Sequence, residues 1–238
     1  MPHGVLADLV QRPAKTRHRL HAVAPHQVQA QSVHPVIAHP CHARVDHEPF
    51  AHRPARVHPA APSARFHHRA RLVERTTRQF DSIEVVSGDG RTFGGGQSAW
   101  PLGSFDRVVV DAPCSGMGSM RRRPESRWNR TPADVEELTV LQRELLDRAV
   151  ALTRPGGVLT YITCSPHAAE TREQVERLLK AGEVELLDTV ALANECAPQA
   201  LDVPASAGVI KGFSGRTLQL WDHRFGTDLM FVACLRKR

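Results

Sequence analysis

The sequence lacks three features that would place it in a membrane or outside the cell. No apolar run approaches the roughly 18 residues that a membrane-spanning helix needs. The N-terminus has no basic stretch followed by an apolar core, which is the layout of a secretory signal peptide. Five cysteines in 238 residues, an odd number, are not typical of a disulfide framework. We therefore expect a cytoplasmic protein with free thiols and no membrane association.

Glycine is almost missing from the first 70 residues, which contain one of the 16 glycines but 12 of the 14 histidines and 9 of the 17 prolines. The same segment has nine Lys and Arg against three Asp and Glu, so it carries the whole formal charge of +6. Residues 71–238 contain 22 basic and 22 acidic residues and are neutral. The overall charge is therefore no argument by itself for nucleic-acid binding.

Residues 1–68 show no sustained helical or strand periodicity. Their recurrent prolines interrupt both kinds of structure, and few large aliphatic side chains are available for a core, so we expect disorder. A misread frame or start site is an alternative, because the composition changes abruptly near residue 69. The chain is thus divided into a segment at 1–68 and a folded domain at 69–238.

The histidines of this segment raise the possibility of a metal site, and the densest cluster is His39, Cys41, His42 and His47. Structural zinc sites have paired ligands at short, fixed spacing. Here a single cysteine stands among irregularly spaced histidines. We therefore expect a solvated tract and predict no metal site.

From residue 69 onward the sequence alternates helices and strands. Helices are predicted at 70–80, 131–154 and 170–182, and strands at 83–90, 105–116, 158–165, 184–192, 216–221 and 229–235. Thr131 is the expected N-cap of the second helix, with Pro132 at its first position, and Pro155-Gly156-Gly157 is expected to end it. This order implies a mostly parallel, doubly wound α/β sheet, with the last strands forming an antiparallel edge hairpin.

Chemically active side chains follow three of the predicted strands, where such a sheet binds its ligands. They are Asp89, Asp111 with Cys114, and Cys164. Free cysteines are usually inert and buried. Cys114 and Cys164, however, stand in tight turns with Gly, Pro and Ser, where backbone N–H groups can lower a thiol pKa. Spacing alone leaves a catalytic and a structural role open for both.

Five motifs occur in a fixed order after residue 69. They are DAPCSG (111–116), RRRPESRW (121–128), RPGG (154–157), YITCS (161–165) and GTDLMFVACLRK (226–237). Together they resemble the RsmB/Sun family of RNA cytosine-5 methyltransferases over about residues 69–238. The resemblance implies a Rossmann-like class I methyltransferase sheet, S-adenosylmethionine as cofactor, and RNA, most simply ribosomal RNA, as substrate of a monomeric enzyme.

The resemblance also assigns roles. Cytosine C5 is a weak nucleophile, and a thiolate that adds to C6 makes C5 able to attack the sulfonium methyl group. By resemblance Cys164 supplies that thiolate, and Cys114 assists loss of the C5 proton and release of the product. Asp111 corresponds to an acid at the cofactor and base site, and Asp89 to an acid near the adenine. Asp89 could instead cap its own loop.

A basic run precedes the second predicted helix. Its members are Arg121, Arg122, Arg123, Arg127, Trp128 and Arg130. Arginines beside an aromatic ring suit phosphate contact and base stacking, so we expect this run to bind RNA. A solvated charged loop is the alternative. The target cytosine must leave its stack to reach a buried thiol.

The chain departs from the family at the cofactor. The family begins this fold with a strand and a glycine-rich turn that approaches the ligand closely, and nothing before residue 69 resembles it. Gly94, Gly95 and Gly96 come too late in the chain to replace it. We therefore expect a sheet without its first strands. The chain is either a methyltransferase with a misread N-terminal frame, which its intact motifs favour, or a catalytically inactive relative that only binds RNA.

Overall fold

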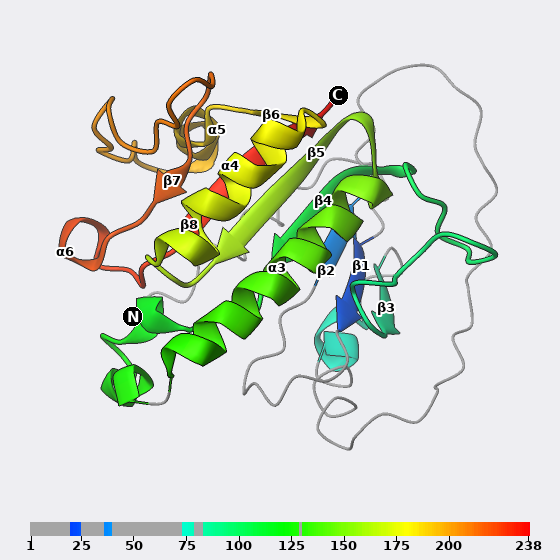
Figure 1. Ribbon diagram of the computed structural model, residues 1–238, viewed down its shortest axis with the longest axis horizontal. Coiled ribbons are helices and arrows are strands. Elements are labelled where there is room, and N and C mark those ends of the chain that lie inside the picture. Colours follow the sequence, from blue (N-terminus) through cyan, green and yellow to red (C-terminus); the bar gives the residue numbers. More distant parts are fainter. Residues whose placement is uncertain (1–19, 25–35, 40–72, 79–82, 129) are drawn as a thin grey trace.

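A computed structural model describes residues 20–24, 36–39, 73–78, 83–128 and 130–238 (Figure 1). The described strands are β1 (Leu20–Ala24), β2 (Val36–His39), β3 (Ile83–Ser87), β4 (Phe105–Asp111), β5 (Thr153–Thr163), β6 (Val184–Leu186), β7 (Leu218–Gln219) and β8 (Phe231–Lys237). The helices are α3 (Pro132–Leu152), α4 (Arg172–Ala181), α5 (Thr189–Cys196) and α6 (Asp222–Phe225), with short 3-10 helices η1 (Met117–Ser119), η2 (Pro124–Trp128) and η3 (Ala168–Glu170). A further helical turn spans 73–77.

The eight strands form one mixed sheet in the order β3-β1-β2-β4-β5-β8-β6, with β7 paired to β8. β4 and β5 are parallel neighbours at its centre, and β8 lies antiparallel between β5 and β6. Helices α3 and α4 lie on the same face of this sheet (Figure 1). The expected Rossmann-like α/β arrangement is confirmed. The expectation of a mostly parallel sheet is wrong, because among the described strands only β1 with β3 and β4 with β5 pair in parallel. None of the helices in the described ranges is long and apolar enough to cross a membrane.

Helix α3 begins where its local sequence predicts. Thr131 is the N-cap and forms a capping box with Asp134, and Pro132 occupies the first turn. The predicted end is wrong, because the helix stops at Leu152 and β5 already begins at Thr153. Thr153 Oγ1 donates to the Ala149 carbonyl at 2.7 Å and closes the last turn two residues before Pro155.

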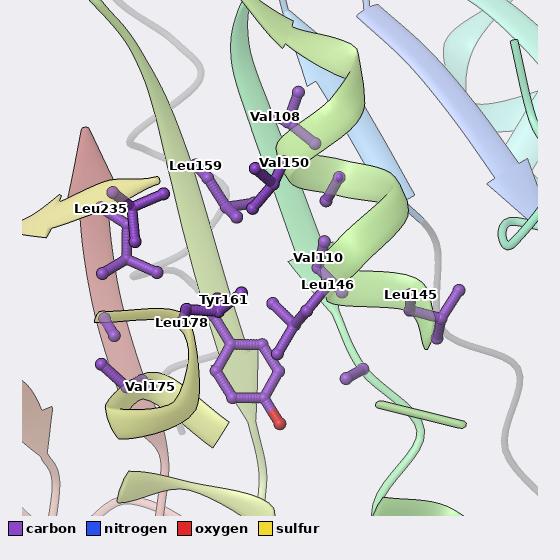
Figure 2. Packing of buried hydrophobic residues seen from close by; sticks show 14 of the residues in the cluster. Val108, Val110, Leu145, Leu146, Val150, Leu159, Tyr161, Val175, Leu178 and Leu235 are labelled. Atoms are coloured by element: carbon purple, nitrogen blue, oxygen red, sulfur yellow. The ribbon is translucent and has the colours of Figure 1, made fainter. Parts of the chain in front are cut away.

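The core lies between the sheet and these two helices. Val108, Val110, Leu159 and Leu235 project from alternate positions of β4, β5 and β8, and all are at most 1% exposed. Figure 2 shows them facing Leu146 and Val150 of α3 and Val175 and Leu178 of α4. Full burial of each such side chain contributes about 1.5 to 3 kcal/mol, so this layer holds the ends of β4 and β5 in place.

The structure differs from the sequence-based expectation before residue 69, because β1 and β2 occupy the sheet between β3 and β4. Both strands are short apolar runs, and prolines 25, 35 and 40 stand directly outside them rather than within. β2 runs antiparallel to β4, with Val36 opposite Val110 and His39 opposite Arg107. The carboxyl end of β2 therefore lies at the edge of the sheet opposite to that of β4.

The last third of the chain also needs correction. The strand predicted at 184–192 ends at Leu186, because Asp188 caps α5 by accepting a hydrogen bond from the Ala191 N–H at 3.0 Å. The strand predicted at 216–221 is reduced to β7. β7 and β8 do pair antiparallel, but α6 connects them and β8 lies inside the sheet, so they are not an edge hairpin.

Candidate active site

Two cysteine turns meet at the carboxyl ends of β4 and β5. The parallel pairing brings Asp111 beside Ile162, and the Ala112 N–H then donates to the Ile162 carbonyl at 2.9 Å. Cys114 and Cys164 follow these positions, and their sulfur atoms lie 3.2 Å apart. Residues separated by 50 positions in the sequence thus form one thiol pair, as the order of the predicted strands implied.

The two thiols differ in their surroundings. Cys114 is 2% exposed, whereas Cys164 is only half-buried. The pKa of Cys114 is raised well above its ordinary value by the hydrogen bond with Cys164, by burial, and by the negative charges of Cys164 and Glu170. A backbone hydrogen bond from Gly116 acts in the opposite direction but is outweighed. The expectation that this turn lowers the thiol pKa is therefore wrong for Cys114, which is a neutral thiol at physiological pH.

One carboxylate joins the two turns, and sequence reasoning missed it. Glu170, the last residue of η3, is fully buried. Its Oε1 accepts from the Ser115 N–H at 2.7 Å, and its Oε2 accepts from the hydroxyls of Ser115 and Ser165, each at 2.6 Å. Since Ser115 follows Cys114 and Ser165 follows Cys164, the same carboxylate holds both turns. In the sequence, Glu170 looks like an ordinary first-turn acid of the predicted helix at 170–182.

Two further side chains connect this carboxylate to the core. Gln142 of α3 is fully buried, and its Nε2 donates to the Pro113 carbonyl at 2.8 Å and to Glu170 Oε1 at 3.3 Å. The Tyr161 hydroxyl donates to the Glu170 main-chain carbonyl at 2.7 Å. The site is thus anchored to α3 and β5 rather than to loops alone.

Gly118 brings three chain segments into contact. Its N–H donates to the Cys164 carbonyl and its carbonyl accepts from the Leu229 N–H, both at 2.9 Å. A Cβ atom at this position would lie 2.3 Å from the Leu229 oxygen and 2.7 Å from the Cys164 oxygen. Only glycine permits this approach, so Gly118 fixes the turn that carries Cys164.

The two predicted acids lie in different settings. Asp111 is the last residue of β4 and is half-buried, at the carboxyl end of the strand that leads to Cys114. Asp89 follows β3, accepts from the Arg91 N–H at 2.9 Å, and forms an ion pair with the Arg91 guanidinium at 2.7 Å. These contacts are those of the alternative interpretation, in which Asp89 caps its own loop.

The basic run begins just beyond the thiol pair. Arg121 pairs with Asp222 at 3.0 Å, and Arg122 forms a two-point ion pair with Asp228. That pair raises the pKa of Arg122, and the charge on Cys164 adds a smaller contribution in the same direction.

The rest of the run is more open. Arg123 is exposed, Arg130 is half-buried, and Trp128 is 80% exposed at the end of η2. Arg127 lies in the same short helix.

Within the described ranges, His, Cys, Asp and Glu side chains form no group of three or more that could hold a metal ion. Of the histidine-rich cluster, only His39 belongs to a described strand, and Cys41, His42 and His47 lie outside the described residues.

Comparisons with known proteins agree with this arrangement. The sequence profile of the family described as 16S rRNA methyltransferase RsmB/F matches residues 61–236. The chain is 49% identical over 183 residues to Rv1407 of Mycobacterium tuberculosis, a methyltransferase by name, covering 77% of this chain and 35% of that protein. It is 40% identical over 138 residues to ribosomal RNA small subunit methyltransferase B of Sodalis glossinidius, covering 58% and 31%.

Solved structures give the same result for the fold. NSun6 from Pyrococcus horikoshii, determined with SFG, is 25% identical and covers 71% of this chain and 39% of that chain, with a TM-score of 0.54. The crystal structure of PH0851 is 26% identical over 71% of this chain and 35% of that chain, with a TM-score of 0.57. The chain spans about a third of the length of the curated relatives named above.

Proposed function

The chain belongs to the 16S rRNA methyltransferase RsmB/F family, and from this premise we propose that it carries the cytosine half of an RNA cytosine-5 methyltransferase site. The observation that carries the proposal is the thiol pair, with Cys114 and Cys164 at 3.2 Å from two separate strand ends. A single buried cysteine is common, but two in contact on strand-end turns are unexpected for packing alone. Ribosomal RNA is the proposed substrate, because the related protein of Sodalis glossinidius bears that name.

The electrostatics support Cys164 as the nucleophile. Glu170 places a negative charge near Cys114, whereas the positive guanidinium of Arg122 interacts with Cys164. Cys164 is also the more exposed of the two thiols. The thiolate is therefore favoured at Cys164, and Cys114 retains its proton.

The proposed reaction begins with the Cys164 sulfur forming a bond to C6 of the cytosine. The C5–C6 electron pair moves to C5, which then takes a new substituent and must lose its original proton before the sulfur leaves. The C5 proton passes to solvent water, and Cys114, as a neutral thiol hydrogen-bonded to the Cys164 sulfur, assists this loss and the release of the product by stabilising the departing thiolate. Asp111, at the end of β4, is proposed to face the base from the same side.

S-adenosylmethionine is the proposed methyl donor of the family reaction, because the NSun6 structure contains SFG, an analogue of it. The described residues of this chain do not fit that donor. The sequence between β1 and β2 has no glycine, β2 runs antiparallel to β4, and Asp89 is held by Arg91. The chemistry proposed for this chain is therefore that of the two thiols alone.

A test without donor follows from this chemistry. Addition of a thiolate at C6 lets solvent protons replace the C5 hydrogen, so RNA tritiated at cytosine C5 should release tritium when incubated with the protein. RNA containing 5-azacytosine should form a covalent adduct, because N5 takes up a proton after the thiolate adds. Cys164→Ser should abolish both signals, and Cys196→Ser, at an exposed position in α5, should preserve them. Retention of both signals in Cys164→Ser would refute the assignment.

A second function, RNA binding without catalysis, is favoured by the same lack of a donor turn. It predicts RNA affinity that falls steeply with salt, no release of tritium from C5, and no response to S-adenosylmethionine. Calorimetric titration of S-adenosylmethionine into the chain adds a direct measurement: binding in the micromolar range would restore the complete reaction to this chain.

A further inference from the structure

Within the described residues, the Glu170 carboxylate accepts hydrogen bonds from four donors, none of which carries a charge. Ser115 supplies its N–H and its hydroxyl, Ser165 its hydroxyl, and Gln142 its side-chain amide. A fully buried carboxylate loses its hydration, and these donors replace it. The hydrogen bonds that the Glu170 side chain accepts come from the serines beside the two thiols and from Gln142, so the arrangement calls for a role beyond packing.

The position of the donors shows what the carboxylate controls. Ser115 and Ser165 each follow one of the two cysteines, and their hydroxyls converge on the same oxygen, Oε2. The hydroxyls themselves are 3.4 Å apart, close to the 3.2 Å between the sulfur atoms of Cys114 and Cys164. The two turns therefore run side by side, joined at the serines by Glu170 and meeting at the sulfurs.

The side chain at position 170 must accept hydrogen bonds, because both serine hydroxyls point toward it. Two hydroxyls that share one carboxylate oxygen both direct their protons at it, which fixes the hydroxyl orientations. An amide in the same place would offer one oxygen and one NH2 group, and the NH2 would face donors. A glutamine at position 170 therefore keeps the volume, but its NH2 group faces either the two hydroxyls or the Ser115 N–H and the Gln142 amide, so the network loses hydrogen bonds on one side.

We propose that Glu170 is a positioning residue that sets the separation of Cys114 and Cys164 through Ser115 and Ser165. At that separation one thiol can add to the cytosine while the other assists loss of the C5 proton. This inference rests on the proposed function for the role of the thiols. The separation itself is a property of the folded chain, and it can be measured without RNA.

The experiment compares the wild-type chain, Glu170→Gln, and Glu173→Gln as a matched control. Glu173 is exposed in the first turn of α4, so its substitution removes the same charge without touching the network. Each protein is equilibrated with mixtures of oxidised and reduced glutathione. The Cys114–Cys164 disulfide forms as the two thiols are oxidised and one oxidised glutathione is reduced to two thiols. Its fraction is measured by peptide mass spectrometry, and the fold by circular dichroism.

We expect Glu170→Gln to lower the equilibrium constant for this disulfide by about tenfold or more, the effect of about one lost hydrogen bond, with Glu173→Gln equal to wild type. An unchanged constant in folded Glu170→Gln would overturn the proposal. If Glu170→Gln does not fold, Ser165→Ala removes the link to one turn only, and the same comparison decides.

Release of tritium from cytosine C5 separates this inference from the function on which it rests. Loss of the release in Glu170→Gln together with a shifted disulfide equilibrium supports both. A shifted equilibrium with no release from any protein, wild type included, refutes the proposed function and leaves the positioning role intact. A merely structural role would lower the stability of Glu170→Gln without changing the equilibrium of the thiols in the folded chain.

Discussion

Substitution of Gly118 by alanine tests whether close backbone approach holds the Cys164 turn. The new Cβ would lie 2.3 Å from the Leu229 oxygen, 2.7 Å from the Cys164 oxygen and 2.8 Å from the Cys164 carbonyl carbon. All three are backbone atoms, so no side chain can rotate away to make room. The segments that carry Cys164 and Leu229 must separate instead.

The cost follows from the contacts that are lost. The hydrogen bonds from Gly118 to Cys164 and from Leu229 to Gly118, both 2.9 Å long, contribute about 1 kcal/mol each. Overpacking adds about 1 to 3 kcal/mol. We therefore expect Gly118→Ala to lower the free energy of unfolding by about 3 to 5 kcal/mol.

Gly116 provides a matched control in the same turn. It has φ +72°, and a Cβ there would meet only Ser119 Oγ at 4.0 Å. Gly116→Ala should therefore cost only the left-handed backbone penalty of about 1 to 2 kcal/mol. Urea unfolding at equilibrium measures both variants. If Gly118→Ala is no less stable than Gly116→Ala, the argument from steric approach is wrong.

Three other predictions concern separate parts of the fold. Because the pKa of Cys114 is raised in the folded chain, its thiol contributes stability that is fully present below the ordinary thiol pKa and declines as the pH rises above it. Between about pH 8 and about pH 10, the free energy of unfolding should therefore fall by at most about 1.4 kcal/mol per pH unit for this thiol. Cys114→Ala should flatten that pH dependence in urea titrations. Asp228→Asn should remove the ion-pair partner of Arg122 and lower the free energy of unfolding by less than about 1 kcal/mol. The released guanidinium should add a phosphate contact, so the slope of log RNA affinity against log salt concentration in filter-binding assays should steepen by about one unit or slightly less. An unchanged slope would argue against RNA contact by this arginine. Thr131→Ala should remove the capping box with Asp134 and lower the free energy of unfolding by about 1 kcal/mol, with Thr139→Ala, half-buried within α3, as the comparison.

The parts of the fold that sequence predicts are those set by neighbouring residues. The start of α3 follows from Thr131, Pro132 and Asp134, which act within one turn. The meeting of Cys114 and Cys164 follows from strand order, because parallel neighbours end at the same edge of the sheet.

The parts that sequence misses depend on distant contacts. Glu170 has the signature of a first-turn acid, and only the docking of η3 against the Ser115 turn gives it an interior position. β1 and β2 are too short to show the alternating periodicity of a strand in the sequence. Their strand structure depends on pairing with β3 and β4, which are distant in the chain. Asp188 has two possible roles in sequence, within a strand or as a helix cap, and its hydrogen bond to Ala191 selects the second.

The distance along the chain between the two halves of the carboxylate network has a consequence for folding. Ser115 and Glu170 are 55 residues apart, and between them lie α3 and β5. Closing a loop of this length costs entropy that only the packed core offsets, so these contacts belong to the late steps of folding. Without the docking of η3, the turns that carry the two cysteines would have no carboxylate to join them. The thiol pair therefore depends on the docking of η3 against the Ser115 turn, and its disulfide equilibrium also reports whether the native structure has formed.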